Sequence, residues 1–200
     1  MRVAWVRLAF LAAVLPAATA AGGDLNGPVS FVPWKVIAPG ETPAKAPLTL
    51  YWVPASRADF KHSELLFSRP LTSYASQCVA MHVIRADDAA MIEKLGVAGS
   101  LPVAVLTDGD GKQLGKVDNN RATLNVAAVE KLVRDQLRAR EATLDARLDD
   151  ARKKAVAGDR DAAVAVYKSI WDLRCVFPRK AREAERELKK LGIAVADASM

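Results

Sequence analysis

Residues 48–59 read LTLYWVPASRAD, and this stretch decides the fold of the chain. Its first six residues are aliphatic, aromatic or β-branched and carry no charge, which favours a buried β-strand. Pro54 then ends the strand pattern. Ser56, followed three residues later by Asp59, is a helix-capping pair with an acid in the first turn, where the helix dipole favours it. The stretch therefore predicts a central strand that leads directly into a helix.

The chain around this stretch alternates between strands and helices. Residues 21–47 are rich in glycine and proline, and their one short apolar run, 34–37, predicts an edge strand in an extended segment. Downstream, the apolar spacing and the turn residues predict a helix over 60–77, a strand over 79–84, a helix over 89–95, strands over 103–106 and 113–117, and a helix that Asn125 begins. The predicted order is strand, helix, strand, helix, strand, strand, helix.

The C-terminal part of the chain has a different pattern. Residues 139–200 are charged and helical, with apolar stripes that are interrupted at Gly158 and Asp159. Pro178 opens a further helix, and Gly192 closes it. The pattern predicts three consecutive helices that form a small appendage.

Three short motifs follow one another as they do in a known family. The YWVP sequence at 51–54 resembles the end of the first central strand of thioredoxins, residues 96–102 resemble the segment leading to their cis-proline, and residues 108–115 resemble their β-hairpin. With the order of strands and helices, these motifs make roughly residues 34–138 similar to the thioredoxin-like superfamily. The resemblance implies an α/β, thioredoxin-like fold followed by the small α-helical appendage, with Pro102 at the cis-proline position.

The chain departs from this family at the active site. In thioredoxins the strand leads into Trp-Cys-Gly-Pro-Cys, where the start of the helix lowers the pKa of the first thiol. The resemblance places Ser56 and Asp59 at the two cysteine positions, and no cysteine occurs between residues 21 and 77. It therefore implies a degenerate motif with no catalytic residue, because a serine hydroxyl cannot form the mixed disulfide of dithiol exchange.

The residues at this helix start have two interpretations. Helix capping alone explains Ser56 and Asp59. Alternatively, Ser56, Arg57 and the backbone of Leu101 and Pro102 form a groove that holds an extended peptide by strand addition, as thioredoxin-like domains can do without chemistry. Neither interpretation requires a cofactor.

The sulfur and imidazole groups are few, namely two cysteines and two histidines. Cys78 and Cys175 have three interpretations: a disulfide that joins the appendage to the thioredoxin-like part, two separate buried thiols, or one exposed redox-active thiol. A disulfide would close a loop of nearly a hundred residues and stabilise the fold by about 3–5 kcal/mol. Cys78 and His82 would lie about 13 Å apart along a strand, so we expect neither a catalytic dyad nor a metal site there.

The appendage carries a second resemblance. The residues Ala157-Gly158-Asp159, Ala163, Tyr167 and Pro178 are similar to the later half of a tetratricopeptide repeat and the start of the next. They amount to little more than one repeat, so the segment must pack on the thioredoxin-like part or on a partner. A structural helical hairpin and a peptide-binding element are both open interpretations.

Residues 1–20 have the three parts of a secretory signal peptide. Arg2 and Arg7 lie in a segment without acids, residues 8–15 are apolar, and residues 18–20 are small, which predicts cleavage after Ala20. The apolar run is far shorter than a membrane span, so we expect no transmembrane segment after cleavage. A composition rich in alanine and arginine is typical of bacteria, so the expected location is the periplasm, or the exterior if the chain is secreted.

The net charge of +6 does not indicate a nucleic-acid-binding protein. Residues 1–20 contribute two basic side chains, residues 21–124 hold ten basic and ten acidic ones, and residues 125–200 hold 17 basic and 13 acidic ones. A neutral body with a mildly basic, acid-interspersed tail is typical of a solvated surface. We therefore expect a protein or peptide partner and no nucleic acid.

Three functions fit this sequence. The first is an exported, non-catalytic thioredoxin-like protein that binds or scaffolds other envelope proteins. The second is a periplasmic protein related to thiol-disulfide oxidoreductases that uses Cys78 or Cys175, and the third is an assembly subunit whose basic residues 174–190 dock an acidic partner. In each case the expected organisation is a signal peptide (1–20), an extended N-terminal segment (21–47), a thioredoxin-like domain (48–138) and a tetratricopeptide-like appendage (139–200).

Overall fold

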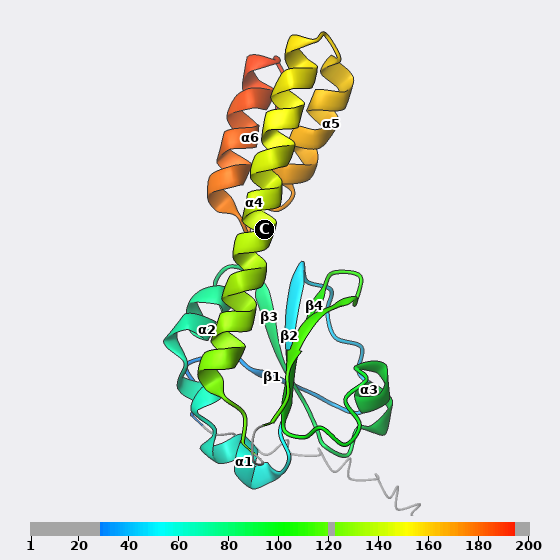
Figure 1. Ribbon diagram of the computed structural model, residues 1–200, viewed down its shortest axis with the longest axis vertical. Coiled ribbons are helices and arrows are strands. Elements are labelled where there is room, and N and C mark those ends of the chain that lie inside the picture. The colour runs from blue at the N-terminus through cyan, green and yellow to red at the C-terminus, as the bar shows by residue number, and fades with distance from the viewer. Residues whose placement is uncertain (1–28, 120–122, 195–200) are drawn as a thin grey trace, which may run out of the picture.

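The structure is a computed structural model that describes residues 29–119 and 123–194. A five-stranded sheet with helices on both faces forms the body, and a bundle of helices extends from it (Figure 1). The signal peptide expected over residues 1–20 lies outside the described residues. None of the helices in the described ranges is both long and apolar enough to cross a membrane.

The sheet has the strand order β1-β3-β2-β4-β5. Its strands are β1 (Lys35–Ile37), β2 (Leu48–Val53), β3 (Val79–Ile84), β4 (Val103–Asp108) and β5 (Gln113–Val117). β1, β3 and β2 are parallel, whereas β4 is antiparallel to β2 and β5 is antiparallel to β4. This order with these strand directions is the thioredoxin-like topology, and it confirms the predicted fold class.

The region predicted as one helix over 60–77 is instead three short helices. They are α1 (Arg57–His62), the 3₁₀ helix η1 (Glu64–Phe67) and α2 (Arg69–Ala75). Ser63 and Ser68 interrupt the helical path, because the hydroxyl of each accepts a hydrogen bond from the backbone of the next turn and so begins a new helix. The prediction of a single helix was wrong because apolar spacing was given more weight than these internal caps.

The two faces of the sheet are covered by different helices. Along β2 the side chains alternate, so Leu50 and Trp52 pack on the side of α2 and α4, whereas Val53 packs toward α3 (Ala89–Lys94). Figure 1 shows α1, α2 and the lower part of α4 on one side of the sheet and α3 on the other. The C-terminal ends of β2 and β3, which precede α1 and α3, therefore lie at the same edge of the sheet.

A single long helix joins the body to the appendage. α4 (Val126–Val156) has 31 residues, and Asn125 caps it by accepting a hydrogen bond from the backbone of Ala128 at 3.0 Å. Its first turns bury Val129 and Val133 against the body, and its later turns bury Leu144 and Leu148. The expected domain boundary between residues 138 and 139 lies inside this helix.

The appendage consists of the second half of α4 with α5 (Arg160–Trp171) and α6 (Pro178–Lys190). The helical appendage expected from the sequence is thus present. Gly158, with a φ of 86°, and the N-cap Asp159 turn the chain from α4 into α5. Tyr167 of α5 and Leu188 of α6 are buried between the helices and belong to the same apolar cluster as Trp52 and Leu137, so the core of the body continues along α4 into the appendage.

A disulfide between Cys78 and Cys175 links the body to the appendage. Cys78 lies just before β3, and Cys175 lies between α5 and α6. Their Cα atoms are 5.8 Å apart, within the usual range for a disulfide, and the two residues are separated by 97 positions in the sequence. Of the three interpretations of these cysteines, the structure therefore supports the covalent link.

Candidate functional site

Ser56 and Asp59 form a reciprocal cap at the start of α1. The backbone N–H of Asp59 donates to Ser56 Oγ at 3.1 Å, and the backbone N–H of Ala55 donates to Asp59 Oδ2 at 2.9 Å. This arrangement is similar to a capping box, but its second donor is Ala55, the residue before the N-cap Ser56. It satisfies two backbone donors at the helix start. Both side chains therefore hold the first turn of α1 in place.

We expect Ser56→Ala to lower the free energy of unfolding by about 1 kcal/mol, because the variant loses one half of this cap. Urea unfolding followed by circular dichroism measures the change. Ser56→Thr is the matched control, since its hydroxyl can accept the same hydrogen bond and should keep most of the stability. An alanine variant as stable as the wild type would contradict the structural role of this cap.

A cleft of about 550 Å³ lies beside this helix start, and we call it the α1 cleft. It lies beyond the carboxyl ends of the parallel strands β1, β3 and β2, the edge at which open α/β sheets commonly bind ligands. The lining residues come from all three strand ends and from α1: Val36, Pro54, Ser56, Arg57, Phe60, Val83, Arg85, Ala86 and Asp87. None of these nine residues carries a thiol.

The α1 cleft combines apolar walls with a charged rim. Val36, on the edge strand, is 47% exposed, and Phe60 packs on Trp52 with 5.5 Å between the ring centroids. On the rim, Arg85 Nε donates to Asp87 Oδ1 at 2.9 Å, and this hydrogen bond lowers the pKa of the Asp87 carboxyl. That pair is neutral as a whole, so the lining residues carry a net charge of only about +1, from Arg57. The cleft therefore suits an apolar side chain better than a highly charged ligand.

The predicted groove residues do not all line one cavity. Ser56 and Arg57 line the α1 cleft, whereas Leu101 lines a neighbouring cleft beside α3, and Pro102 is buried. The Leu101–Pro102 peptide bond is cis, and the pairing of Val53 with Val103 places this dipeptide level with the start of α1. The Leu101 carbonyl accepts a hydrogen bond from Asn119 Nδ2 at 3.0 Å, so one of its lone pairs is already used within the chain.

Sequence reasoning missed several residues that line the α1 cleft. Val36, Arg85 and Asp87 were not identified, although each lies on or just after one of the parallel strands. A signal was present, because residues that follow neighbouring parallel strands meet at one edge of the sheet.

The cysteines lie far from this edge of the sheet. Cys78 precedes β3, and because β3 is parallel to β2, the start of β3 lies at the opposite edge from α1. The disulfide to Cys175 also excludes a Cys78–His82 dyad in this state. Among residues 29–119 and 123–194, no three His, Cys, Asp or Glu side chains gather into a group that could hold a metal ion.

His82 is an almost fully buried imidazole on β3. It lies opposite Tyr51 on the neighbouring strand, with 5.6 Å between the ring centroids, and it is only 5% exposed. Within the described part of the chain, its Nδ1 atom has no hydrogen-bond partner. Burial, and secondarily the charge of Lys35, lowers the pKa of His82.

We expect the free energy of unfolding to decrease as the pH falls from about 7.5 to about 5.5. In the unfolded chain an imidazole has a pKa near 6.5, whereas in the fold that of His82 is lower. The unfolded state therefore binds the proton first, and stability is lost below about pH 6.5. Urea titrations across this range should show a shallower decline for His82→Phe.

The exposed His62 provides the control for this pH dependence. His62→Gln removes that imidazole and leaves His82 in place, so the decline assigned to His82 should remain. An undiminished decline in His82→Phe would contradict the assignment of this effect to His82.

The chain has matches among solved structures but not among protein families or curated proteins. No protein-family model matches the chain, and no curated protein matches it. Among solved structures, it is similar to a thioredoxin from Trypanosoma brucei brucei at 23% sequence identity, covering 47% of this chain and 78% of that chain with a TM-score of 0.35. The fold assignment rests on strand order and direction: the chain has a thioredoxin-like fold with a C-terminal helical appendage.

Proposed function

We propose that this protein is an exported, non-catalytic thioredoxin-like protein that binds other proteins of the bacterial envelope. Its binding site in this proposal is the α1 cleft, and its ligand is an extended peptide segment with an apolar side chain. The proposal of export derives from residues 1–20.

The observation that carries the proposal is the reciprocal cap of Ser56 and Asp59. In a thioredoxin-like enzyme this helix start would present two thiols, and the proposal takes these two residues to occupy the thiol positions. Here both side chains stabilise the helix instead, while the apolar cleft beside them persists. A scaffold that keeps its cleft without thiols supports binding rather than dithiol exchange.

The edge strand β1 favours an extended ligand. Among residues 29–119 and 123–194, β1 pairs only with β3, and Val36 on this strand lines the α1 cleft. A peptide that runs beside β1 can form backbone hydrogen bonds with its open edge while one of its side chains enters the cleft against Phe60. In this proposal the open edge of β1 takes the place of the Leu101–Pro102 backbone as the main surface for strand addition.

Selection from a library of random peptides tests this function, with the mature protein immobilised as bait. We expect selected peptides to be rich in apolar residues and to bind Phe60→Asp at least about tenfold more weakly than the wild type, because the carboxylate would be placed in the apolar wall. Fluorescence anisotropy with labelled peptides measures the affinities.

Phe67→Asp is the control, since Phe67 is an exposed aromatic residue on η1 outside the cleft, whereas Phe60 is partly buried in the cleft wall. Circular dichroism of both variants checks that each keeps its fold. Peptides that bind both aspartate variants equally well would contradict the α1 cleft as the binding site. The alternative function, thiol-disulfide exchange through Cys78 or Cys175, predicts instead that captured peptides form mixed disulfides that a reductant releases.

A further inference from the structure

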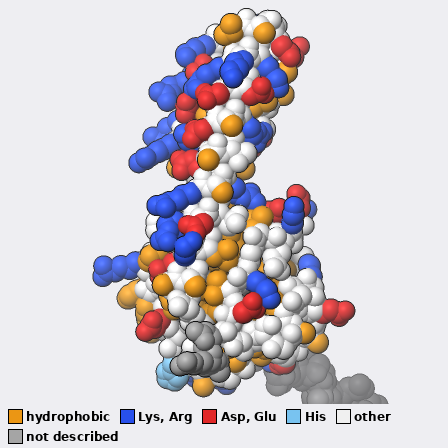
Figure 2. All heavy atoms as spheres, in the orientation of Figure 1, with side chains coloured by type: hydrophobic (Ala, Val, Ile, Leu, Met, Phe, Trp, Pro, Cys, Tyr) orange, Lys and Arg blue, Asp and Glu red, His pale blue; other side chains and the backbone are white. Residues whose placement is uncertain are grey.

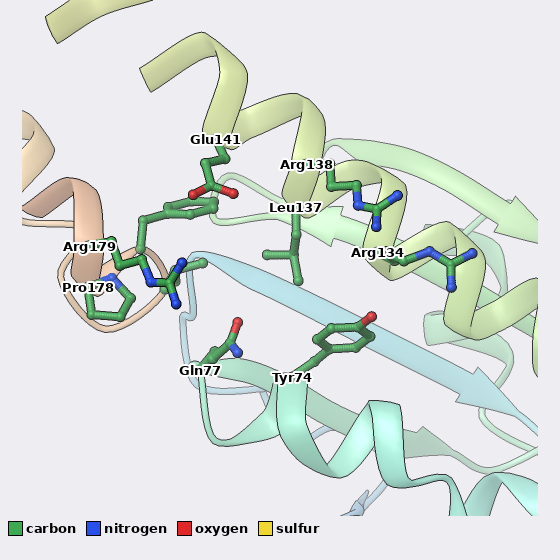
Figure 3. Close-up of a pocket in the computed structure, with 10 residues that line it drawn as sticks. Tyr74, Gln77, Arg134, Leu137, Arg138, Glu141, Pro178 and Arg179 are labelled. Atoms are coloured by element: carbon green, nitrogen blue, oxygen red, sulfur yellow. The ribbon is translucent and has the colours of Figure 1, made fainter. Parts of the chain in front are cut away.

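A second cleft lies where the body meets the appendage, and we call it the junction cleft. It encloses about 430 Å³ between the end of α2, the middle of α4 and the start of α6. Figure 3 shows side chains from these three helices facing the same space, among them Tyr74 of α2, Leu137 and Arg138 of α4, and Arg179 of α6. The junction cleft is separate from the α1 cleft, since the two share no lining residue.

The floor and the rim of the junction cleft differ in chemistry. Leu137 and Phe177 are mostly buried and, with Tyr74, form an apolar floor. The rim carries the guanidinium groups of Arg134, Arg138 and Arg179 and the carboxylate of Glu141. Arg134 Nε lies 3.8 Å from the Asp135 carboxylate, so Arg138 and Arg179 against Glu141 leave a positive rim around an apolar pocket.

The positive charge continues from the cleft along α6. Arg179, Arg182 and Arg186 are exposed and recur every three or four residues, so they lie on one face of the helix and span about 10 Å. Figure 2 shows Lys and Arg side chains gathered on the α6 flank of the appendage. We call Arg138, Arg179, Arg182 and Arg186 the arginine stripe.

The acids of α6 do not neutralise the arginine stripe. Glu183 is paired with Arg152 of α4, Glu185 lies 2.6 Å from Lys189, and Glu187 lies 3.1 Å from Lys190. The nearby Asp145 of α4 is paired with Lys180. Across residues 29–119 and 123–194, no carboxylate lies within ion-pairing distance of any arginine of the stripe. These guanidinium groups are therefore available for carboxylates from outside the chain.

We propose that the junction cleft and the arginine stripe together bind an acidic polypeptide segment that anchors one apolar side chain in the cleft. Guanidinium groups bind carboxylates with two parallel hydrogen bonds, which gives geometric selectivity as well as attraction. Because the stripe extends beyond the cleft along α6, it matches a chain of several carboxylates rather than a single small anion.

The disulfide holds the two walls of this site together. Gln77 and Val176 both line the junction cleft, and they are the immediate neighbours of Cys78 and Cys175. The α2 wall and the α6 wall are therefore fixed relative to each other by a covalent bond as well as by α4. A site whose walls are fixed before the ligand arrives loses less conformational entropy on binding.

The test uses a fluorescently labelled synthetic peptide of aspartate and glutamate residues with one central phenylalanine. Binding to the mature protein is measured by anisotropy at about 50 mM salt, where charge attraction is only weakly screened. We expect the triple variant Arg138→Glu, Arg179→Glu and Arg182→Glu to bind at least about tenfold more weakly than the wild type. Tyr74→Ala should weaken binding severalfold without changing the salt dependence, since it removes only apolar contact.

The matched control is Lys94→Glu with Lys153→Glu and Lys168→Glu, three exposed cations outside the cleft. It changes the net charge by the same amount and should bind like the wild type. Equal weakening in both triple variants would overturn the proposal, because only non-specific charge would then be acting. If a charge-reversed variant loses its helical circular dichroism, Arg→Gln replacements at the same three positions replace it, with a smaller expected loss.

Vesicles of phosphatidylglycerol and phosphatidylcholine separate this proposal from lipid binding. Vesicles should not displace the labelled peptide, because a flat anionic surface cannot place a side chain in the cleft. Displacement of the peptide by vesicles, or vesicle binding without peptide binding, would overturn the proposal in favour of a membrane surface. Phe60→Asp serves as an independence check: it should leave this peptide bound, so failure of the α1 cleft proposal and failure of this one are distinguishable.

Discussion

Replacing both cysteines, as Cys78→Ala with Cys175→Ala, is expected to lower the free energy of unfolding by about 4 kcal/mol. The disulfide closes a loop whose ends are separated by 97 positions, so it removes a large amount of conformational freedom from the unfolded chain. Urea or guanidinium unfolding of the wild type and the double variant measures the difference. Few single substitutions in this chain should lower the free energy of unfolding by more, since most substitutions lower it by about 0.5–3 kcal/mol.

Reduction of the wild-type protein provides a second route to the same result. The reduced protein should unfold at nearly the denaturant concentration of the double alanine variant, because both lack the same covalent link. A loss below about 1 kcal/mol in either sample would contradict a structural role for this bond.

Trp52→Ala is the second change with a large expected effect, about 3–5 kcal/mol of unfolding free energy. Trp52 is fully buried on the central strand β2 and contacts Trp34 and Phe60, each with 5.5 Å between ring centroids. Its removal would leave a cavity beneath the α1 cleft and deprive Phe60 of its support. Peptide binding in the cleft should therefore weaken together with stability.

Trp52→Phe is the matched control for this change. It keeps an aromatic ring in the core and removes the indole N–H, which is buried with no hydrogen-bond partner in the described structure. The phenylalanine variant should therefore lose much less stability than the alanine variant. Equal losses of unfolding free energy in the two variants would contradict ring packing as the contribution of Trp52 to stability.

The central part of the fold was predictable because its sequence signals are local and consistent. β2, β3 and β5 have the predicted bounds. β2 and β3 are uncharged, β-favouring runs, whereas β5, which contains Lys116, was predictable from the turn residues 108–111 that precede it. The division of residues 57–75 into three short helices was harder to predict. The serines that divide them, Ser63 and Ser68, look like ordinary polar positions of one amphipathic helix. The course of α4 through both parts of the molecule was also missed, because its apolar stripe changes partner without changing its spacing.

The sites were less predictable than the fold, because their residues are assembled from distant segments. The cap of Ser56 and Asp59 is local and was predicted. The α1 cleft combines the ends of three strands, and the junction cleft combines α2, α4 and α6. Whether Cys78 meets Cys175 depends on the angle at which the appendage leaves the body, and no local pattern encodes that angle.

The most direct test of non-catalytic binding is a nuclear magnetic resonance titration of isotopically labelled protein with a selected apolar peptide that carries one cysteine. The account predicts amide shift changes confined to residues around the α1 cleft, such as Ser56, Phe60 and Arg85, and an unchanged protein mass afterwards. Shift changes centred on Cys78 and Cys175, together with a covalent peptide adduct, would contradict it and establish thiol-disulfide exchange in its place.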